Sequence, residues 1–317
     1  MKLLSYHEPG LGPRIGVLTR DNAVIDITTD EAPGLLELLQ ICAEERVSLN
    51  VLVAEMQELA VNARARPAPW ESEEATLYDA LNNPPNPDSR HLLPPIEAPE
   101  VWGCGVTYKR SSDMRDDDAE TDIYSRVYHA DRPEIFFKST ARSVVGHQGK
   151  IGIRRDSKLT AAEPELAFVL AADGKIAGYT LCNDVSAWDI ERDNPLYLPQ
   201  SKMYNGCCAL GPVFITPGEI DDPYSLEIVC SARRGEEELW SGSVNTSQIN
   251  WKFEQLIEYL LRDNDCPVGT TVATGTGIIA PNDIPLQHGD IVDIHCDPIG
   301  TLSNPAEQFS DETDSHA

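Results

Sequence analysis

The stretch A-A-E-P-E-L-A-F-V-L-A-A-D-G-K-I-A-G-Y-T-L-C-N-D, residues 161–184, predicts a β-hairpin at the centre of the chain. Two apolar runs, 166–170 and 175–182, flank the dipeptide Asp173-Gly174. An Asp-Gly pair between such runs is a strong signal for a two-residue hairpin turn. Residue 172 would then face residue 175, and the two residue numbers of every facing pair along the hairpin would add up to 347. The sequence therefore predicts a long antiparallel strand pair here.

Three carboxylates converge at the open end of this hairpin. Glu163 falls opposite Asp184, and Glu165 lies on the same face because side chains two apart on a strand point the same way. Like charges brought together repel, so a cation should lie between them. Oxygen ligands alone favour Mg²⁺, with Mn²⁺ or Ca²⁺ as alternatives, and three protein ligands leave coordination positions for water or substrate. The alternative is that Glu163 and Asp184 only end a hairpin at the solvent, and a bulge would shift the pairing by one residue.

Composition limits the classes of partner. The 317 residues carry 52 acidic and 25 basic side chains, a formal charge of −27, which repels nucleic acid and anionic membranes. No long apolar run or secretory signal is visible, so we expect a cytoplasmic protein. The acidic, Lys-poor surface fits either adaptation to high salt or an ordinary acidic enzyme. Eight cysteines without a C-x-x-C motif predict reduced, mostly buried thiols and no zinc site.

Residues that break helices and strands divide the chain into three predicted parts. We expect a small N-terminal α/β domain over 1–90, with a hairpin at 15–19 and 23–27 and helical periodicity over 32–62. The run Asn82-Asn83-Pro84-Pro85-Asn86-Pro87 places a boundary after it. A β-rich catalytic domain should follow over 91–303, and an acidic, disordered tail over 304–317.

Within the β-rich part, short strands and one main helix are predicted. The strand candidates are 213–216, 226–232 and 291–296, and the helix spans 247–262. The acidic stretch 113–122 is either a solvated surface loop or a mobile lid over the site. His295 and Asp293 share one face of an ordinary strand and are interpreted as structural.

Several spaced motifs resemble the fumarylacetoacetate hydrolase family, over about 210 residues and in the family's order. They are P-E-I-F-F-K-S-T (133–140), E-P-E-L-A-F-V-L (163–170), A-G-Y-T-L-C-N-D-V-S-A (177–187), Lys202, A-L-G-P (209–212), A-T-G-T-G (273–277) and I-G-T-L-S-N-P (299–305). The resemblance implies an α+β, β-rich fold: the family's mixed β-roll, commonly dimeric, with a small N-terminal domain.

The resemblance also implies roles for residues. Glu163, Glu165 and Asp184 would hold Mg²⁺, and Lys202 would project beside the substrate. Thr276, in the T-G-T-G loop, would bind the substrate carboxylate through its hydroxyl and backbone amide. The neighbouring Gly275 fits this reading because glycine lets the backbone approach an anion closely. Taken alone, such a loop is most often only a turn.

One departure from the family pattern bears on the reaction. Hydrolytic members carry N-Y-x-x-H-x-x-E, whose His and Glu activate water, whereas this chain reads T-Y-K-R-S-S-D-M at 107–114. Ser111 and Met114 stand where the His and Glu would be, which puts hydrolysis in doubt. The carboxylate and lysine spacing instead resembles the branch that dehydrates 2-keto-3-deoxypentonates to 2-oxoglutarate semialdehyde.

The mechanism expected from this resemblance begins with a small-molecule 2-oxo acid that chelates the cation, which stabilises the enolate formed when C3 loses a proton. Loss of the C4 hydroxyl follows. Lys202 is the candidate base, with a pKa lowered by burial and by the nearby cation. Glu134 is a candidate proton relay or hydroxyl ligand, or alternatively an edge-strand charge. The competing hypotheses are a C–C hydrolase or decarboxylase acting on an acylpyruvate or diketo acid, and a non-catalytic binding protein. A homodimer or larger homo-oligomer is expected.

Overall fold

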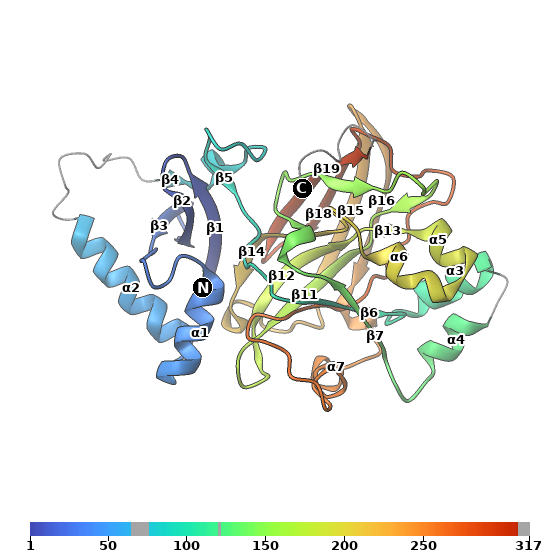
Figure 1. Ribbon diagram of the computed structural model, residues 1–317, viewed down its shortest axis with the longest axis horizontal. Helices are drawn as coiled ribbons and strands as arrows, with labels where there is room; N and C mark the ends of the chain where they lie inside the picture. Colours follow the sequence, from blue (N-terminus) through green and yellow to red (C-terminus); the bar gives the residue numbers. More distant parts are fainter. Residues whose placement is uncertain (65–75, 120–121, 310–317) are drawn as a thin grey trace.

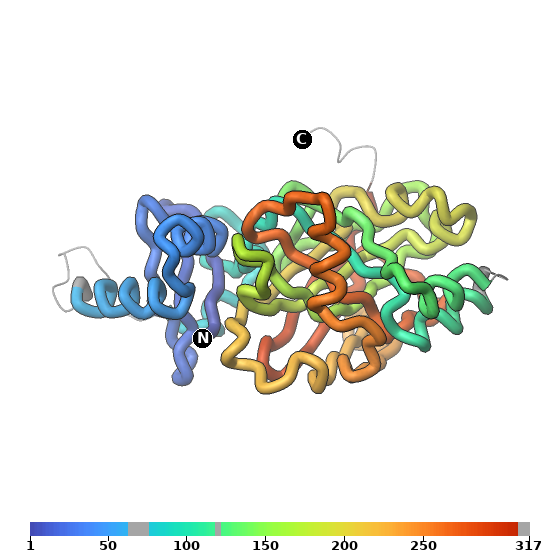
Figure 2. The backbone as a smooth tube through the Cα atoms, turned by 90° about the horizontal axis from the view of Figure 1, so that it is seen from below, coloured from blue at the N-terminus to red at the C-terminus, as the bar shows by residue number. Residues whose placement is uncertain are grey.

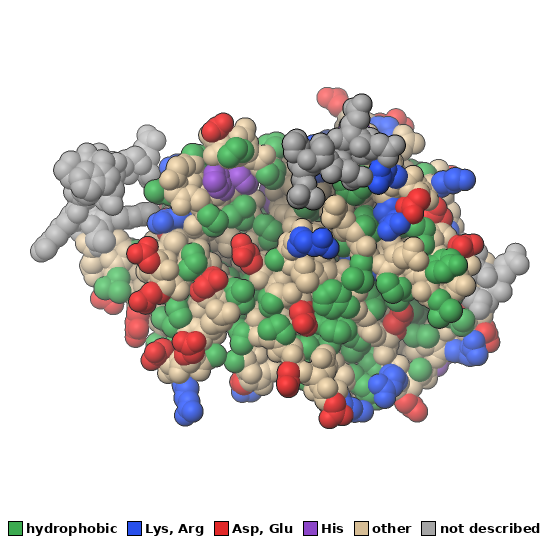
Figure 3. All heavy atoms as spheres, viewed as in Figure 1, with side chains coloured by type: hydrophobic (Ala, Val, Ile, Leu, Met, Phe, Trp, Pro, Cys, Tyr) green, Lys and Arg blue, Asp and Glu red, His purple; other side chains and the backbone are tan. Residues whose placement is uncertain are grey.

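The computed structural model describes residues 1–64, 76–119 and 122–309 of the chain. It is elongated, with the N-terminal elements at one end and a larger β-rich body at the other (Figure 1). On the face shown in Figure 3, acidic side chains lie over both ends and alternate with Lys and Arg. None of the helices in the described ranges is long and apolar enough to cross a bilayer.

The N-terminal elements are a β-meander and two helices. Pairing of Gly16 with Asp26 and of Leu18 with Val24 confirms the predicted first hairpin. The elements are β1 (Lys2–Glu8), β2 (Gly12–Leu18), β3 (Ala23–Asp26), α1 (Leu35–Glu45), α2 (Leu49–Arg64), β4 (Thr76–Leu77), η1 (Tyr78–Leu81) and β5 (His91–Leu92).

The helical periodicity expected over 32–62 is confirmed, and the structure divides it into two helices. Arg46 adopts a left-handed conformation with φ 56° and donates its N–H to the carbonyl of Cys42, which ends α1. Ser48 then accepts the N–H of Val51 on its hydroxyl at 3.4 Å and starts α2. A left-handed residue cannot be recognised from apolar periodicity alone.

One sheet connects the two ends of the molecule. Its strand order is β4-β3-β2-β1-β14-β12-β11-β17-β6-β7, with β5 paired to β1 and β8 paired to β14. Lys2 of β1 lies opposite Ile215 of β14, so the N-terminal strands continue the larger sheet. The division of the chain near residue 90 stays a prediction.

A second sheet, of order β16-β15-β18-β19-β9, completes the β-rich body. Helix α7 lies below the β-rich body in Figure 1 and in front of it in Figure 2, and its Phe253 packs against Phe168 and Tyr179 of the larger sheet. The remaining elements are β6 (Val101–Gly105), α3 (Lys109–Ala119), α4 (Ile123–Tyr128), β7 (Glu134–Ser139), η2 (Ala141–Ser143), β8 (Val144–Val145), β9 (Ile151–Ile153), β10 (Thr160–Ala161), β11 (Pro164–Leu170), β12 (Ile176–Asp184), β13 (Ser186–Ala187), α5 (Trp188–Asp193), η3 (Pro195–Tyr197), α6 (Leu198–Lys202), β14 (Cys208–Ile215), η4 (Pro217–Glu219), β15 (Glu227–Arg234), β16 (Glu237–Asn245), η5 (Thr246–Gln248), α7 (Phe253–Leu260), β17 (Thr271–Ala273), β18 (Ile291–Cys296) and β19 (Gly300–Gln308).

The main helix is shorter than predicted. Instead of 247–262 it covers only Phe253–Leu260, because the chain before it forms η5 and then extends at Ile249. The N–H of Asn250 donates to the carbonyl of Thr107 at 3.0 Å, which ties this segment to the chain before α3. The predicted apolar stripe survives within α7, where Phe253, Leu256 and Leu260 are buried.

The tail predicted to be disordered from Asn304 is partly a strand. β19 continues to Gln308, with β18 on one side and β9 on the other. Asn304 is buried, and its amide donates to the carbonyls of Gly146 and Gly149, both at 2.8 Å. Pairing on both sides and these hydrogen bonds order a segment that lacks large apolar groups. Residues 310–317 of the expected tail lie outside the described residues.

Residues 113–119 of the acidic stretch are helical and do not form a loop. They belong to α3, where Lys109 and Asp113 form an exposed ion pair one turn apart at 2.8 Å. Asp116 accepts the backbone N–H groups of Tyr124 and Ser125 and so fixes the start of α4. Residues 120–121 lie outside the described residues, and a lid role stays a prediction.

Candidate active site

The predicted facing of Glu163 and Asp184 is confirmed, although the turn differs from the expected one. The N–H of Gly174 donates to Ala171 at 3.1 Å, so the loop has three residues and Ala171, not residue 172, faces Lys175. Gly174 takes φ 73°, which a glycine adopts without strain. A register shift between Val169 and Leu170 then restores the sum of 347, and Pro164 pairs with Asn183. The two deviations cancel before the strands reach the carboxylates.

The three predicted carboxylates meet in the interior. One oxygen each from Glu163, Glu165 and Asp184 can be chosen so that all lie within 4.8 Å of one another, and the three residues are 1–3% exposed. This excludes the alternative that Glu163 and Asp184 merely end a hairpin at the solvent. Across the described residues, this is the one group of three or more His, Cys, Asp or Glu side chains found with metal-binding geometry. His295 instead lies at the surface, beside Thr301 and Asp297.

Lys202 enters the cluster from the end of α6. Its ammonium group donates to Asp184 at 2.8 Å, to Glu163 at 3.1 Å and to the Ser186 hydroxyl at 2.7 Å. Burial lowers the pKa of Lys202, but attraction to Asp184 and Glu163 outweighs burial and raises it. The prediction that the pKa of Lys202 is lowered is therefore wrong as long as only protein groups surround it.

A second lysine, Lys138 on β7, supports Asp184 from within the core. It is fully buried, ion-paired with the Asp184 carboxylate at 2.5 Å, and bonded to the carbonyl of Val185 at 2.9 Å. The sequence reasoning missed this residue although it quoted the motif containing it, because a lysine in a strand is ordinarily exposed.

Arg115 on α3 and Trp188 on α5 complete the contacts of Glu163. The Arg115 guanidinium donates to Glu163 at 3.0 Å, and the indole N–H of Trp188 donates to the same oxygen at 2.6 Å. Burial alone would raise the pKa of Glu163, but Lys202 and Arg115 hold it well below its usual range. Arg115 was missed because it lies among aspartates in a stretch interpreted as a surface loop or lid.

Glu165 has the opposite electrostatic environment. Burial and then the charges of Asp184 and Glu163 raise its pKa well above the usual range. Its one close donor is the N–H of Gly275, at 2.6 Å. Gly275 takes φ 92°, and a Cβ there would meet the Thr107 hydroxyl at 2.1 Å, so glycine is required.

The other predicted site residues lie around the same cavity. Thr276 is buried beside Gly275, with its hydroxyl donating to the carbonyl of Ile278 at 3.2 Å. Glu134 lies at the start of β7, where burial and the charge of Glu191 raise its pKa. The lining of this cavity also includes Ser111, Arg115 and Glu191.

The charges around this cavity suit a divalent cation. Five carboxylates line it (Glu134, Glu163, Glu165, Asp184 and Glu191), and three cations oppose them (Arg115, Lys138 and Lys202). The acidic groups outnumber the basic ones, which favours the binding of a cation. Oxygen ligands in a buried cluster fit Mg²⁺, Mn²⁺ or Ca²⁺, and the described residues offer no His or Cys at the triad for a softer metal.

Comparison with known proteins agrees with this site. Residues 101–306 match the model of the fumarylacetoacetate (FAA) hydrolase C-terminal family. The chain belongs to the fumarylacetoacetate hydrolase family. The β-rich fold and the order of the family motifs predicted from sequence are thereby confirmed.

Within the fumarylacetoacetate hydrolase family, dehydratases are among the similar proteins. The chain is 48% identical over 222 residues to 2-dehydro-3-deoxy-D-arabinonate dehydratase of Saccharolobus solfataricus, which covers 68% of this chain and 74% of that protein. It is 37% identical over 305 residues to a protein of Haloferax volcanii named "Probable 2-keto-3-deoxyxylonate dehydratase", which covers 95% and 98%. A solved structure of 2-keto-3-deoxy-D-arabinonate dehydratase complexed with magnesium and 2,5-dioxopentanoate superposes with a TM-score of 0.79 at 37% identity, covering 98% and 99%.

Proposed function

We propose that this protein is a Mg²⁺-dependent hydro-lyase that converts a 2-keto-3-deoxypentonate to 2-oxoglutarate semialdehyde, which is 2,5-dioxopentanoate. The observation that carries the proposal is the buried triad of Glu163, Glu165 and Asp184, in a chain that aligns over almost its whole length with a dehydratase complexed with magnesium and that aldehyde. Relatives named as dehydratases of the arabinonate and xylonate derivatives support the same substrate class.

Glu163, Glu165 and Asp184 would hold the cation, with Mn²⁺ or Ca²⁺ as alternatives to Mg²⁺. A cation there supplies Lewis acidity to the keto and carboxylate oxygens of the substrate and so acidifies the protons on C3. Lys138 and the N–H of Gly275 orient Asp184 and Glu165 from behind. Thr276 would bind the substrate carboxylate.

Lys202 and Glu134 are the candidate groups for moving the C3 proton. Both line the cavity beside the triad. Lys202 is the proposed base, and a cation held by Glu163 and Asp184 would repel the ammonium and weaken its ion pairs, which favours a neutral amine. Glu134 is the proposed relay, since burial and the charge of Glu191 raise the pKa of its carboxyl above the ordinary value. The walls around the triad are buried and keep bulk water away from the carbanionic state.

Hydrolysis of a C–C bond or decarboxylation is the competing activity. Ser111 lines the cavity where hydrolytic relatives carry a water-activating His, and a serine cannot act as the same base near pH 7. Purified protein with Mg²⁺ should therefore consume 2-keto-3-deoxypentonate and leave acetylpyruvate intact. Turnover of acetylpyruvate alone would establish the competing activity, and failure to convert either compound would favour a binding protein.

We also propose a cytoplasmic homodimer or larger homo-oligomer that does not bind nucleic acid or membranes. The net charge of −27 supports the last two points, since it opposes binding to phosphate-rich surfaces. Light scattering coupled to size-exclusion chromatography tests the assembly, and a mass equal to one 34.9 kDa chain would contradict it.

A further inference from the structure

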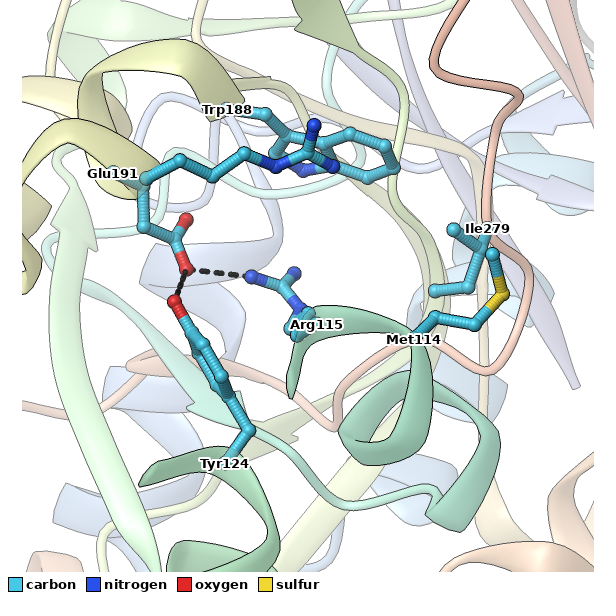
Figure 4. Close-up of a pocket in the computed structure, with 7 residues that line it drawn as sticks. Met114, Arg115, Tyr124, Trp188, Glu191 and Ile279 are labelled. Atoms are coloured by element: carbon cyan, nitrogen blue, oxygen red, sulfur yellow. Dashed lines mark hydrogen bonds and ion pairs between the residues drawn. The ribbon is translucent and has the colours of Figure 1, made fainter. Parts of the chain in front are cut away.

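A second cavity lies next to the cavity of the triad, on the far side of Arg115. Met114, Tyr124, Trp188 and Ile279 line this second cavity, and it shares Arg115 and Glu191 with the first (Figure 4). Thr276 belongs only to the first. A substrate whose carboxylate end lies at Thr276 and whose keto group lies at the triad would therefore extend its remaining carbons toward Arg115 and Glu191.

Arg115 fixes the position of Glu191 relative to the triad. One nitrogen of its guanidinium donates to Glu163, and the other donates to Oε1 of Glu191 at 2.5 Å. The Tyr124 hydroxyl, at 3.4 Å, donates to the same Oε1 (Figure 4). The carboxylates of Glu191 and Glu163 thus bond to the same guanidinium group. A short carbon chain that is bound at the triad can therefore reach Glu191.

The second oxygen of Glu191 has no donor. Glu191 is 5% exposed, and its Oε2 has no hydrogen-bond partner in the described parts of the chain. A buried carboxylate oxygen without a donor is costly, because it has given up water and gained no partner in exchange. Arg115 and Tyr124 both donate to Oε1, which leaves Oε2 as the unpartnered oxygen of a residue that lines both cavities, where a general base would be placed.

The proposed reaction itself demands a base at the far end of the substrate. In its first half, C3 loses a proton and C4 loses hydroxide, which together form water and leave a C3–C4 double bond conjugated with the C2 ketone. In its second half, C5 must change from a hydroxymethyl group to an aldehyde. A proton leaves C5, a proton returns to C3, and the resulting C4–C5 enol takes a proton on C4 as its hydroxyl proton leaves. Substrate and product differ by one water, so no oxidant is needed.

We propose that Glu191 is the base that removes the proton from C5, through Oε2. This inference rests on the proposed function, because it assigns the second half of that reaction. C5 lies three carbons beyond C2, on the side where the cavity leads from the triad to Arg115 and Glu191. Lys202 and Glu134, beside the triad, serve the C3 end.

Stereospecific labelling tests whether a base on the protein acts at C5. The full-length protein with Mg²⁺ is given 2-keto-3-deoxypentonate with one deuterium at C5, in each of the two configurations. A fixed base removes one of the two hydrogens, so the aldehyde should keep the deuterium from one substrate and lose it from the other. Equal loss from both would overturn the inference, because the second half would then occur without a positioned base. A protein that consumes neither substrate contradicts the proposed function itself.

The variant Glu191→Gln tests which residue is the base. Gln keeps an oxygen for Arg115 and Tyr124 but cannot accept a proton, so the hydroxylated enone should accumulate in proton NMR spectra. We expect the ratio of aldehyde formed to substrate consumed to fall by about 100-fold or more, with loss of the stereochemical preference. Asp193→Asn is the matched control: it removes an exposed carboxylate from the same helix, α5, and leaves Glu191 untouched, so its ratio should match the wild type. An unchanged ratio in Glu191→Gln, or a folded variant that consumes no substrate, would overturn the assignment.

Discussion

The backbone N–H of Asp184 donates to the carbonyl of Glu163 over 2.9 Å, so these two residues leave neighbouring strands at the same level. Their carboxylates therefore share one face of the sheet. Everything else in the site is arranged around this pair: Lys202 contacts both, Lys138 supports Asp184, and Arg115 supports Glu163.

Substitution of Asp184 and substitution of Glu165 should change the free energy of unfolding by different amounts. Asp184→Asn leaves the buried Lys138 without its counter-ion and Lys202 with Glu163 alone, so we expect a loss of about 3–5 kcal/mol in the free energy of unfolding in excess chelator. Glu165→Gln removes a carboxylate that its neighbours repel, and should be close to neutral or stabilising under the same conditions. Urea denaturation of both variants measures this difference. Equal losses would contradict the charge distribution described above.

Divalent cations should stabilise the wild-type protein. A ligand that binds only the folded state at 100 times its Kd adds about 2.7 kcal/mol to the free energy of unfolding. We expect the melting temperature to rise with Mg²⁺ concentration, and to rise far less in Glu165→Gln because one ligand is lost. Differential scanning calorimetry makes the measurement. An equal rise in both proteins would place the cation elsewhere.

Loss of the Lys202 amine should remove catalysis without removing the metal. We expect Lys202→Ala to lower kcat by about 100- to 10,000-fold, which is the range for loss of a general base. Calorimetric titration with Mg²⁺ should still show binding, since all three carboxylates remain. Lys202→Met, which keeps most of the side-chain volume, controls for altered packing. Wild-type turnover in either variant would exclude the lysine from the mechanism.

Acid should weaken the contact between the N-terminal elements and β19 through His147. This ring contacts Asn82 at 2.8 Å and accepts the N–H of Ser303 at 3.1 Å, so it is held neutral. Burial lowers the pKa of His147 below its ordinary value near 6.5, and the charge of Asp293 offsets this only in part. The unfolded chain then takes up the proton first, so the contribution is fully present above about pH 6.5 and is lost as the pH falls.

Urea denaturation between pH 7.5 and pH 5.5 checks this expectation. The free energy of unfolding of the wild type should fall more steeply with decreasing pH than that of His147→Gln, which cannot be protonated. Parallel curves for the two proteins would show that His147 does not contribute to the acid response.

Salt should stabilise the fold. With 52 acidic and 25 basic residues the chain repels itself, and screening shortens the range of that repulsion. We expect the melting temperature to rise with KCl concentration, well beyond the rise for a near-neutral protein of similar size. A flat response up to molar KCl would favour the ordinary acidic enzyme over the salt-adapted one.

Local regularities in the sequence were enough to predict the central part of the site. An Asp-Gly turn and the two-residue period of a strand placed Glu163, Glu165 and Asp184 on one face, and the compensating bulge preserved that result. The same reasoning failed for the segments from Asn304 to Gln308 and from Asp113 to Ala119. Their order comes from partners far along the chain, which composition does not reveal.

The sequence by itself determined the β-hairpin, the carboxylate triad and the resemblance to a metal-dependent family, because each depends on neighbours within one strand pair or on a spaced motif. Only the tertiary structure decided that Arg115 and Glu191 reach the same cavity from α3 and α5, and that Lys138 pairs with Asp184. Such contacts join residues tens of positions apart, and they form because buried charges must find opposite charges once the surrounding strands and helices exclude water.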